Sequence, residues 1–381
     1  MKRFLVTMLA IILVGSFILA GCAAPAPTLA PTPTPAPAPT PTPTPAPTPA
    51  PTPTPTPAPA PVKPIELKFA YHTPPRASLV PEFFVPWTQA IEKAAGGQVK
   101  ITHYGGETLV KLADNYDAVV SGLADMAMVE PDVTPGRFPL SEINRLPFIF
   151  SDAEITARVY HELLEKYCTN EWKEVKVLVC PALSPLEYFG TKQVHVLEDF
   201  KGMKIRGGGT VEGWIFQALG ATPVEIPTPE LYTSLERGLV NGCFFNVAGV
   251  MGFKIHEVTK NRTMCALYPA TWVIVMNLQT WEKLPANVKK AFTDNSGVEA
   301  SAFYSARNES VNAASIKAIQ AYDEKVGNKD WYVLPDYERN RWKAVAGVPV
   351  WDKWLDPLIG QGLPAKAMLQ DAIDLVEKYS K

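Results

Sequence analysis

The sequence predicts an α/β protein with two lobes, and three observations lead to this fold class. Beyond residue 65, segments that alternate like strands are followed by segments with helical spacing of apolar residues, which is typical of a mostly parallel sheet covered by helices. Residues 65–381 are numerous enough for two lobes of ordinary domain size. In the second half, a strand pattern at 203–206 runs through three glycines at 207–209 into a helix pattern. Glycines at the end of a strand let backbone or ligand approach closely, so we expect a binding cleft there.

The first 21 residues read as a secretory signal peptide. A basic end with Lys2 and Arg3 precedes an apolar stretch at 4–19 and small residues before Cys22. The sequence LAGC at 19–22 resembles the bacterial lipoprotein cleavage box, in which the cysteine becomes the lipidated first residue. We therefore expect Cys22 to carry acyl chains that hold the protein at a membrane, outside the cytoplasm.

Residues 23–61 consist almost wholly of Ala, Pro and Thr. This composition cannot bury a core and favours extended polyproline II, so we interpret residues 22–64 as the lipidated cysteine and its tether. The net charge of −2 falls to −4 without Lys2 and Arg3, and the absence of a basic stripe argues against a nucleic-acid partner. The other four cysteines could form disulfides outside the cytoplasm or remain buried free thiols: Cys168, Cys180, Cys243 and Cys265.

The pattern of the first lobe begins with a strand at 66–70 and a proline-rich loop at 71–75. A helix at 83–94, a strand at 99–104, helices at 111–123 and 151–174 and a strand at 175–179 follow. In such sheets, ligands bind beyond the carboxyl ends of the strands. We therefore expect three loops to face the cleft: the loop with His72, the turn after residue 104, and the stretch that begins with Val129 and Glu130.

The chain is predicted to cross to the second lobe at 187–193, where Tyr188 is a further candidate for the site. Strands at 203–206, 222–226 and 242–246 and a helix at 229–238 form that lobe. An apolar run at 271–278 predicts a buried strand that returns to the first lobe, with Trp272 at its cleft end. A long helical pattern from 285 past 319, with a break near Gly297, would brace both lobes, and helices near 342–358 and 365–379 close the second lobe.

Arg206 is the predicted anchor of the site because it ends the strand before the three glycines. Its planar guanidinium can donate two parallel hydrogen bonds to a carboxylate and stays charged at physiological pH. The alternative is a solvated arginine at a strand end, which is common on protein surfaces.

Several stretches resemble the DctP-type solute receptors of tripartite ATP-independent periplasmic (TRAP) transporters. They are LKFAYHTPP at 67–75, LPFIFSDA at 146–153, DFKGMKIR at 199–206 and ALGATPVEIPTPELYTSLERGLVNG at 218–242. The resemblance implies a two-lobed periplasmic-binding-protein fold of type II character, braced by a long helix. Lobe 1 would comprise 65–190 and 271–310, and lobe 2 would comprise 191–270 and 311–381. It also implies a receptor, not an enzyme, that closes about strands near 187–193 and 269–275 on a small organic acid and delivers it to the small and large membrane subunits.

The resemblance further implies roles for individual residues. The arginine equivalent to Arg206 binds the ligand's carboxylate, and Lys192 stands where relatives often carry a basic residue. Many relatives have D-G-x-x-N-P where this sequence reads NGCFFN, so Phe245 takes the place of a ligand-contacting asparagine and Asn246 the place of the proline. This departure favours a more apolar or aromatic ligand than a sugar acid or a small dicarboxylate.

Other functions remain as alternatives. A binding protein of an ATP-driven transporter shares the two-lobed plan, and a surface enzyme or adhesin could sit on a Pro/Thr stalk. The pairs His161-Glu162 and His256-Glu257 lack the second histidine of a zinc-protease helix, and we find no other metal-binding spacing. We therefore expect no cofactor, although a cation such as calcium could accompany the ligand.

Overall fold

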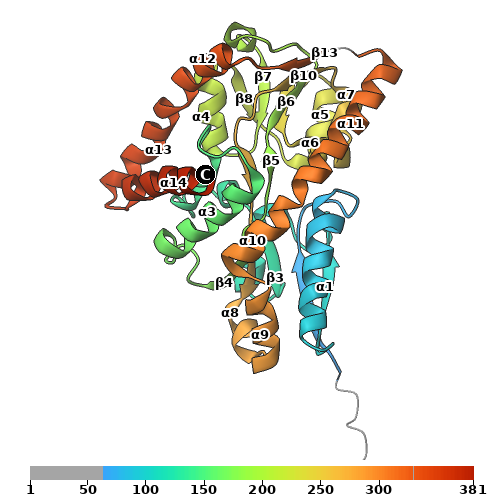
Figure 1. Ribbon diagram of the computed structural model, residues 1–381, viewed down its shortest axis with the longest axis vertical. Coiled ribbons are helices and arrows are strands. Elements are labelled where there is room, and N and C mark those ends of the chain that lie inside the picture. Colours follow the sequence, from blue (N-terminus) through green and yellow to red (C-terminus); the bar gives the residue numbers. More distant parts are fainter. Residues whose placement is uncertain (1–62, 329) are drawn as a thin grey trace, which may run out of the picture. The chain divides into compact units, whose positions relative to one another are not determined.

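The computed structural model describes residues 63–328 and 330–381 (Figure 1). The expected signal peptide, the expected lipidation at Cys22 and nearly all of the expected tether lie outside these residues. In the described ranges, no helix combines the length and the apolar character that a membrane span requires.

The first lobe is built on a five-stranded sheet in the order β2-β1-β3-β12-β4. Strands β1 to β3 run parallel, whereas β12 is antiparallel to both of its neighbours. His72 follows β1 and Glu130 follows β3, so the parallel strands deliver both side chains to the same edge of the sheet. The strand bounds are β1 Ile65–Ala70, β2 Val99–Tyr104, β3 Met126–Val129, β4 Val175–Val179 and β12 Val273–Asn277.

The helices of the first lobe cover this sheet and bury a core that includes Phe69, Phe84 and Trp87. Their bounds are α1 Val85–Ala94, α2 Asn115–Val120, α3 Ala153–Tyr167, α8 Leu278–Lys283 and α9 Ala286–Asp294. Helix α3 begins after Asp152, whose carboxylate accepts the Ile155 amide at 2.8 Å, because that cap satisfies an otherwise free N–H. The predicted helices at 111–123 and 151–174 are therefore real but shorter than their patterns suggested.

The second lobe holds a six-stranded sheet in the order β13-β10-β6-β9-β7-β8. Its strands are β6 Glu187–Gly190, β7 Lys204–Gly207, β8 Thr222–Glu225, β9 Gly242–Phe245, β10 Asn261–Met264 and β13 Asp330–Val333. Its helices are α4 Thr210–Ala218, α5 Leu231–Glu236, α6 Val247–Gly252 and α7 Ile255–Val258. Parallel strands β7, β8 and β9 carry Arg206, Thr228 and Asn246 at or just beyond their carboxyl ends.

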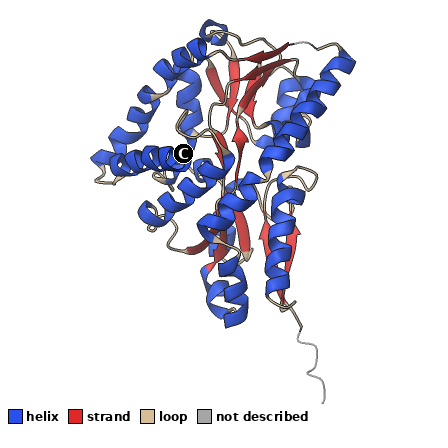
Figure 2. Ribbon diagram, viewed as in Figure 1, coloured by secondary structure: helices blue, strands red, loops and turns tan. Residues whose placement is uncertain are grey.

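Two short strands connect the lobes. β5 (Ala182–Pro185) and β11 (Pro269–Thr271) pair antiparallel in a sheet of their own, and Figure 2 shows them between the two larger sheets. The second crossing agrees with the predicted 269–275. The first crossing lies before the predicted 187–193, because residues 187–190 already belong to β6 of the second sheet.

The predicted bracing helix consists of α10 (Gly297–Ala306) and α11 (Asn308–Val326), and the break between α9 and α10 falls near Gly297 as expected. Helix α10 packs on α3 and β4 of the first lobe, and α11 packs on α6 of the second (Figure 1). Ser301 and Ser305 accept the backbone amides of Cys180 and Ala182 at 2.9 and 3.0 Å. The brace is therefore bonded directly to the first crossing strand.

The last three helices contact both lobes, whereas the sequence placed them on the second lobe alone. They are α12 Asp336–Ala346, α13 Val348–Gly360 and α14 Ala365–Tyr379. Helices α12 and α13 pack on α4, and α14 packs on α3 (Figure 1). The Trp351 and Trp354 indoles donate to the carbonyls of Pro147 and Pro139 at 3.0 and 2.9 Å. The four described cysteines are buried and unpaired, which agrees with the free-thiol alternative.

Candidate functional site

A cavity lies between the two lobes, at the edge where the parallel strands of both sheets end. The first lobe contributes His72, Glu130 and Arg145, and the second contributes Arg206 and Thr228. The volume of this cavity is about 70 Å³.

Arg206 lines the cavity from the end of β7 and is held in place by its own lobe. Its Nε donates to the carbonyl of Ile226 at 2.9 Å, and one terminal nitrogen donates to Thr228 Oγ1 at 3.0 Å. Both acceptors are neutral, and no carboxylate of the described residues lies within 4.0 Å of the guanidinium. The positive charge of Arg206 is therefore oriented but not neutralised.

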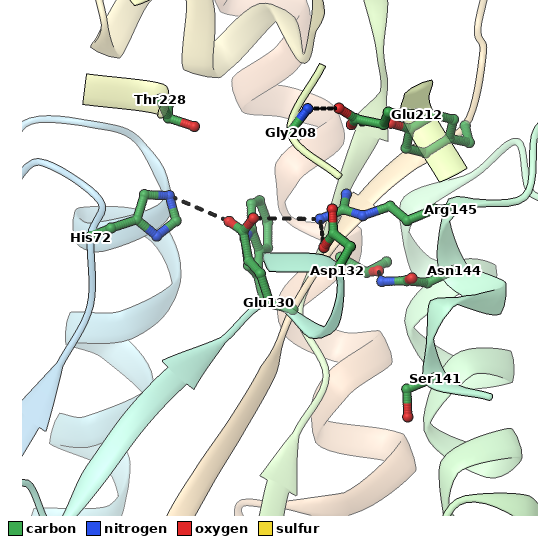
Figure 3. A network of polar contacts seen from close by, with 12 residues as sticks. His72, Glu130, Asp132, Ser141, Asn144, Arg145, Gly208, Glu212 and Thr228 are labelled. Carbon is green, nitrogen blue, oxygen red and sulfur yellow. Dashed lines mark hydrogen bonds and ion pairs between the residues drawn. The ribbon is translucent and has the colours of Figure 1, made fainter. Parts of the chain in front are cut away.

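Arg145, at the end of a short 3₁₀ helix at Ser141–Arg145, instead faces two carboxylates, although its Nε is buried without a hydrogen-bond partner. Its guanidinium lies 2.9 Å from Asp132 Oδ1 and 3.6 Å from Glu130 Oε2 (Figure 3). Burial raises the pKa of Asp132 to about 6, helped by the nearby Glu130 and Glu212 carboxylates and opposed by Arg145. Burial opposes the charge of Arg145, but the surrounding acidic groups hold its pKa well above the usual value.

Glu130 lies between the His72 ring and Arg145 (Figure 3). The Trp272 indole donates to its Oε1 at 2.5 Å, and His72 Nε2 lies 3.5 Å from the same oxygen. Burial favours the neutral form of Glu130, but His72, Arg145 and the Trp272 N–H outweigh it and lower its pKa. Burial lowers the pKa of His72. Glu130 is therefore an ionised carboxylate in the cavity wall.

Glu212 enters the site from the first turn of α4. Its carboxylate accepts a hydrogen bond from the backbone amide of Gly208 at 2.5 Å (Figure 3). It also accepts one from the hydroxyl of Tyr268. An acidic residue is stable there because the first turn of a helix presents free N–H groups and the positive end of the helix dipole. The glycine turn thus positions a carboxylate as well as Arg206.

Aromatic and aliphatic side chains together form the apolar part of the wall. Phe244, Phe245, Phe253 and Trp272 all line the cavity, and Phe245 packs edge-to-face on Phe253 with ring centroids 5.7 Å apart. Asn246 caps α6 by accepting the Gly249 amide at 2.6 Å. Within the described part of the chain, no hydrogen bond uses its Nδ2, which leaves this donor for a ligand.

The lobes touch beside the cavity through glycines of the second lobe. A Cβ atom on Gly209 would lie 2.8 Å from Asp132 Oδ2 and 3.0 Å from its backbone oxygen, and one on Gly252 would lie 2.8 Å from the Ala77 Cβ. The Arg76 Nε also donates to the Gly252 carbonyl at 3.1 Å. These contacts are those of a closed arrangement of the lobes.

Six of the eight predicted site residues line this cavity: His72, Glu130, Arg206, Phe245, Asn246 and Trp272. The other two do not. Lys192 is exposed, and Tyr188 is fully buried with its hydroxyl bonded to the Lys192 carbonyl at 2.7 Å. Glycines 190 and 242 leave room for the Tyr188 ring inside the sheet, so its role there is packing.

Sequence reasoning missed four polar residues that complete the wall: Asp132, Arg145, Glu212 and Thr228. The sequence contained a signal for Glu212, because it stands three residues beyond Gly209 at the start of a helix. An acidic side chain at this position accepts hydrogen bonds from the free backbone N–H groups of the helix start. Arg145 also had a signal, because the polar segment SEINR at 141–145 stands between the apolar segments FPL and LPFIF. In the described residues no group of three or more His, Cys, Asp or Glu is arranged to hold a metal ion.

Comparison with known proteins gives a consistent result. Residues 69–356 match the family described as bacterial extracellular solute-binding protein, family 7 (DctP). The C4-dicarboxylate-binding periplasmic protein DctP of Rhodobacter capsulatus is 24% identical over 321 residues, which cover 80% of this chain and 90% of that protein.

Two solved structures show the same fold. A TRAP solute-binding protein from Rhodoferax ferrireducens, in complex with copurified benzoate, is 28% identical with a TM-score of 0.79, covering 83% of this chain and 98% of that one. A marine metagenome TRAP solute-binding protein specific for aromatic acid ligands, in complex with 3-hydroxybenzoate, is 27% identical with a TM-score of 0.79, covering 84% and 99%. Both the sequence match and the fold lead to one assignment: this chain belongs to the DctP family of extracellular solute-binding proteins.

Proposed function

We propose that this protein is an extracytoplasmic receptor that captures an aromatic monocarboxylate between its lobes and delivers it to the membrane subunits of a TRAP transporter. The observation that carries the proposal is the guanidinium of Arg206, without a carboxylate partner, in a cavity whose lining includes four aromatic side chains. A ligand carboxylate would give this guanidinium a direct ionic partner, and the planar fork suits a carboxylate.

The positions of the two cavity arginines support Arg206 as the anchor. Arg145 already faces Asp132 and Glu130, so a ligand carboxylate would compete there with fixed negative charges. Arg206 keeps neutral oxygens as partners, and these fix its orientation without using its charge. A preoriented cation loses little side-chain entropy when the ligand binds.

The aromatic character of the ligand is supported by the wall and by the relatives. Phe244, Phe245, Phe253 and Trp272 provide flat apolar surfaces against which a ring can pack. Benzoate and 3-hydroxybenzoate occupy the two solved relatives described above, and a third, from Bordetella bronchiseptica at 27% identity and a TM-score of 0.75, holds mandelate. Phe245 stands where many relatives carry a polar asparagine, and this difference also favours an aromatic ligand.

Capture would proceed by closure about the crossing strands β5 and β11. The ligand must stabilise the closed state more than the open one, because only then does closure report occupancy to the transporter. Arg206 and Thr228 would hold the carboxylate from the second lobe, while His72 and Glu130 approach from the first. The lobe division at 65–190 plus 271–310 and 191–270 plus 311–381 belongs to this proposal, with the first crossing moved to β5 and the last helices shared.

The location is also part of the proposal. The LAGC box at 19–22 supports lipidation of Cys22, and the Ala/Pro/Thr segment would tether the receptor to that membrane. The membrane subunits of the transporter are the expected partners, as the family implies.

The test is identification of the natural ligand. Native mass spectrometry of protein purified from its host without dialysis should show an aromatic monocarboxylate, and a thermal-shift panel should show larger stabilisation by such acids than by succinate or malate. Selective stabilisation by C4-dicarboxylates or by sugars would refute the proposed ligand class.

A further inference from the structure

The cavity carries more negative than positive groups before any acid enters. Glu130, Asp132 and Glu212 line it as carboxylates, against the two guanidiniums of Arg145 and Arg206. Burial lowers the pKa of His72, against the effect of the nearby Glu130 and Glu107 carboxylates, so its ring is a weaker positive group than the two guanidiniums. Once Arg206 engages a ligand carboxylate, the rest of the wall holds three carboxylates around one arginine.

The three carboxylates differ in how fully they are used. Asp132 is 3% exposed, bonds Arg145 at 2.9 Å and packs on Gly209. Glu212 is 5% exposed and accepts both Gly208 N–H and the Tyr268 hydroxyl. Two donors therefore occupy Glu212, whereas Asp132 is held by Arg145 and covered by Gly209.

Glu130 can still accept hydrogen bonds from a ligand. Its side chain is 13% exposed, and it lines the cavity. The Trp272 N–H is its one hydrogen-bond donor in the described chain, because His72 Nε2 at 3.5 Å and Arg145 at 3.6 Å are too distant. An ionised carboxylate has about four lone-pair positions, so most of them remain open. The His72 Nδ1 beside it is also buried without a partner.

We propose that Glu130 selects the ligand: it accepts a hydrogen bond from a donor group on the far side of the acid, and its charge excludes a second carboxylate. This inference rests on the proposed function and narrows it to aromatic monocarboxylates that carry a hydroxyl or amino substituent. Phthalate-type diacids and C4-dicarboxylates would be rejected.

The physical basis is the low dielectric of a closed cavity. A second ligand carboxylate near Glu130 would be an unscreened like charge, which lowers affinity by about 100-fold or more. A hydroxyl in the same place donates a charge-assisted hydrogen bond to Glu130 and replaces the water that is lost on closure. An analogue without this donor leaves the buried carboxylate unpaired and binds more weakly.

Glu130→Gln tests this directly, because glutamine has the same shape and still accepts a hydrogen bond but carries no charge. Calorimetry would measure the affinities for 3-hydroxybenzoate and for isophthalate, in which a carboxylate replaces the hydroxyl at the same ring position. The ratio of the two affinities in the wild-type protein is expected to be about 100 or more in favour of 3-hydroxybenzoate. It should fall at least about tenfold in Glu130→Gln, since the repulsion is removed.

Glu236→Gln is the matched control, since Glu236 is exposed on α5 and does not line the cavity. The ratio of the affinities for 3-hydroxybenzoate and isophthalate in Glu236→Gln should equal that of the wild type. An unchanged thermal midpoint of unliganded Glu130→Gln would show that the variant folds.

If the wild type binds both acids and the ratio in Glu130→Gln falls by less than tenfold, the role of Glu130 is refuted while the proposed function stands. If the wild type binds neither acid and no other aromatic monocarboxylate, the proposed function and this inference fall together.

Discussion

The substitution Gly209→Ala should weaken ligand binding without unfolding the protein. Gly209 belongs to the second lobe, and an added Cβ would lie 2.8, 2.9 and 3.0 Å from the Oδ2, Cβ and backbone oxygen of Asp132 in the first lobe. Ordinary contact begins at 3.4 Å, so the lobes would have to stay about 0.5 Å further apart. One of the three atoms is backbone, which cannot move aside as a side chain can.

The effect should fall on the closed state alone. Gly209 has φ −170° and ψ −177°, an extended conformation that alanine adopts without strain. Overpacking of this kind costs about 1–3 kcal/mol, which corresponds to an affinity about 5- to 150-fold lower. Calorimetry with 3-hydroxybenzoate measures the affinity, and thermal unfolding of the unliganded protein measures the stability.

Gly213→Ala is the control, because Gly213 lies in α4, which begins directly after Gly209, and its added Cβ meets no atom within 4 Å. It should bind ligand normally and gain about 0.5–1 kcal/mol of stability from the better helix propensity of alanine. Wild-type affinity in Gly209→Ala would refute the closure contact between Asp132 and Gly209.

Two further predictions concern charged groups. In this arrangement of the lobes, burial and the nearby Glu130 and Glu212 raise the pKa of Asp132 to about 6 against the opposing effect of Arg145. Opening would take Gly209 and Glu212 away from Asp132 and bring its pKa back towards the ordinary value of about 4. Closure therefore binds a proton, so affinity for an aromatic acid should rise about tenfold as the pH falls from 7.5 to 5. The variant Asp132→Asn should show a flat profile, and a wild-type affinity that falls over this range would contradict the reasoning. Asp323→Asn leaves the buried Arg262, now 2.9 Å from Asp323, without its counter-ion and should cost about 3–5 kcal/mol in urea unfolding; an unchanged midpoint would contradict that role.

Local pattern was sufficient for most of the fold. The strands at β1, β2, β7, β8 and β9 follow from alternation, and the break near Gly297 follows from glycine in a long helical pattern. Pattern does not reveal which partner an amphipathic helix packs against. This is why the last helices were assigned to one lobe, although Trp351 and Trp354 bond to first-lobe carbonyls.

The site was predictable where a residue ends a strand and unpredictable where tertiary contacts assemble it. His72, Glu130 and Arg206 follow directly from strand ends. Arg145 reaches the cavity from a 3₁₀ helix far from any strand end, and only the fold brings it to Asp132. Lys192 is expected from resemblance alone, but it lies exposed in the bend that follows β6.

The most direct test of the central claim is calorimetry of Arg206→Ala with the ligand that copurifies with the wild-type protein. Arg206 is half-buried and bonds only neutral oxygens of its own lobe, so its loss should change stability little. The account predicts an affinity lower by about 100-fold or more, with Arg206→Lys in between because it keeps the charge and loses the fork. An undiminished affinity in Arg206→Ala would contradict the claim that this guanidinium anchors the acid.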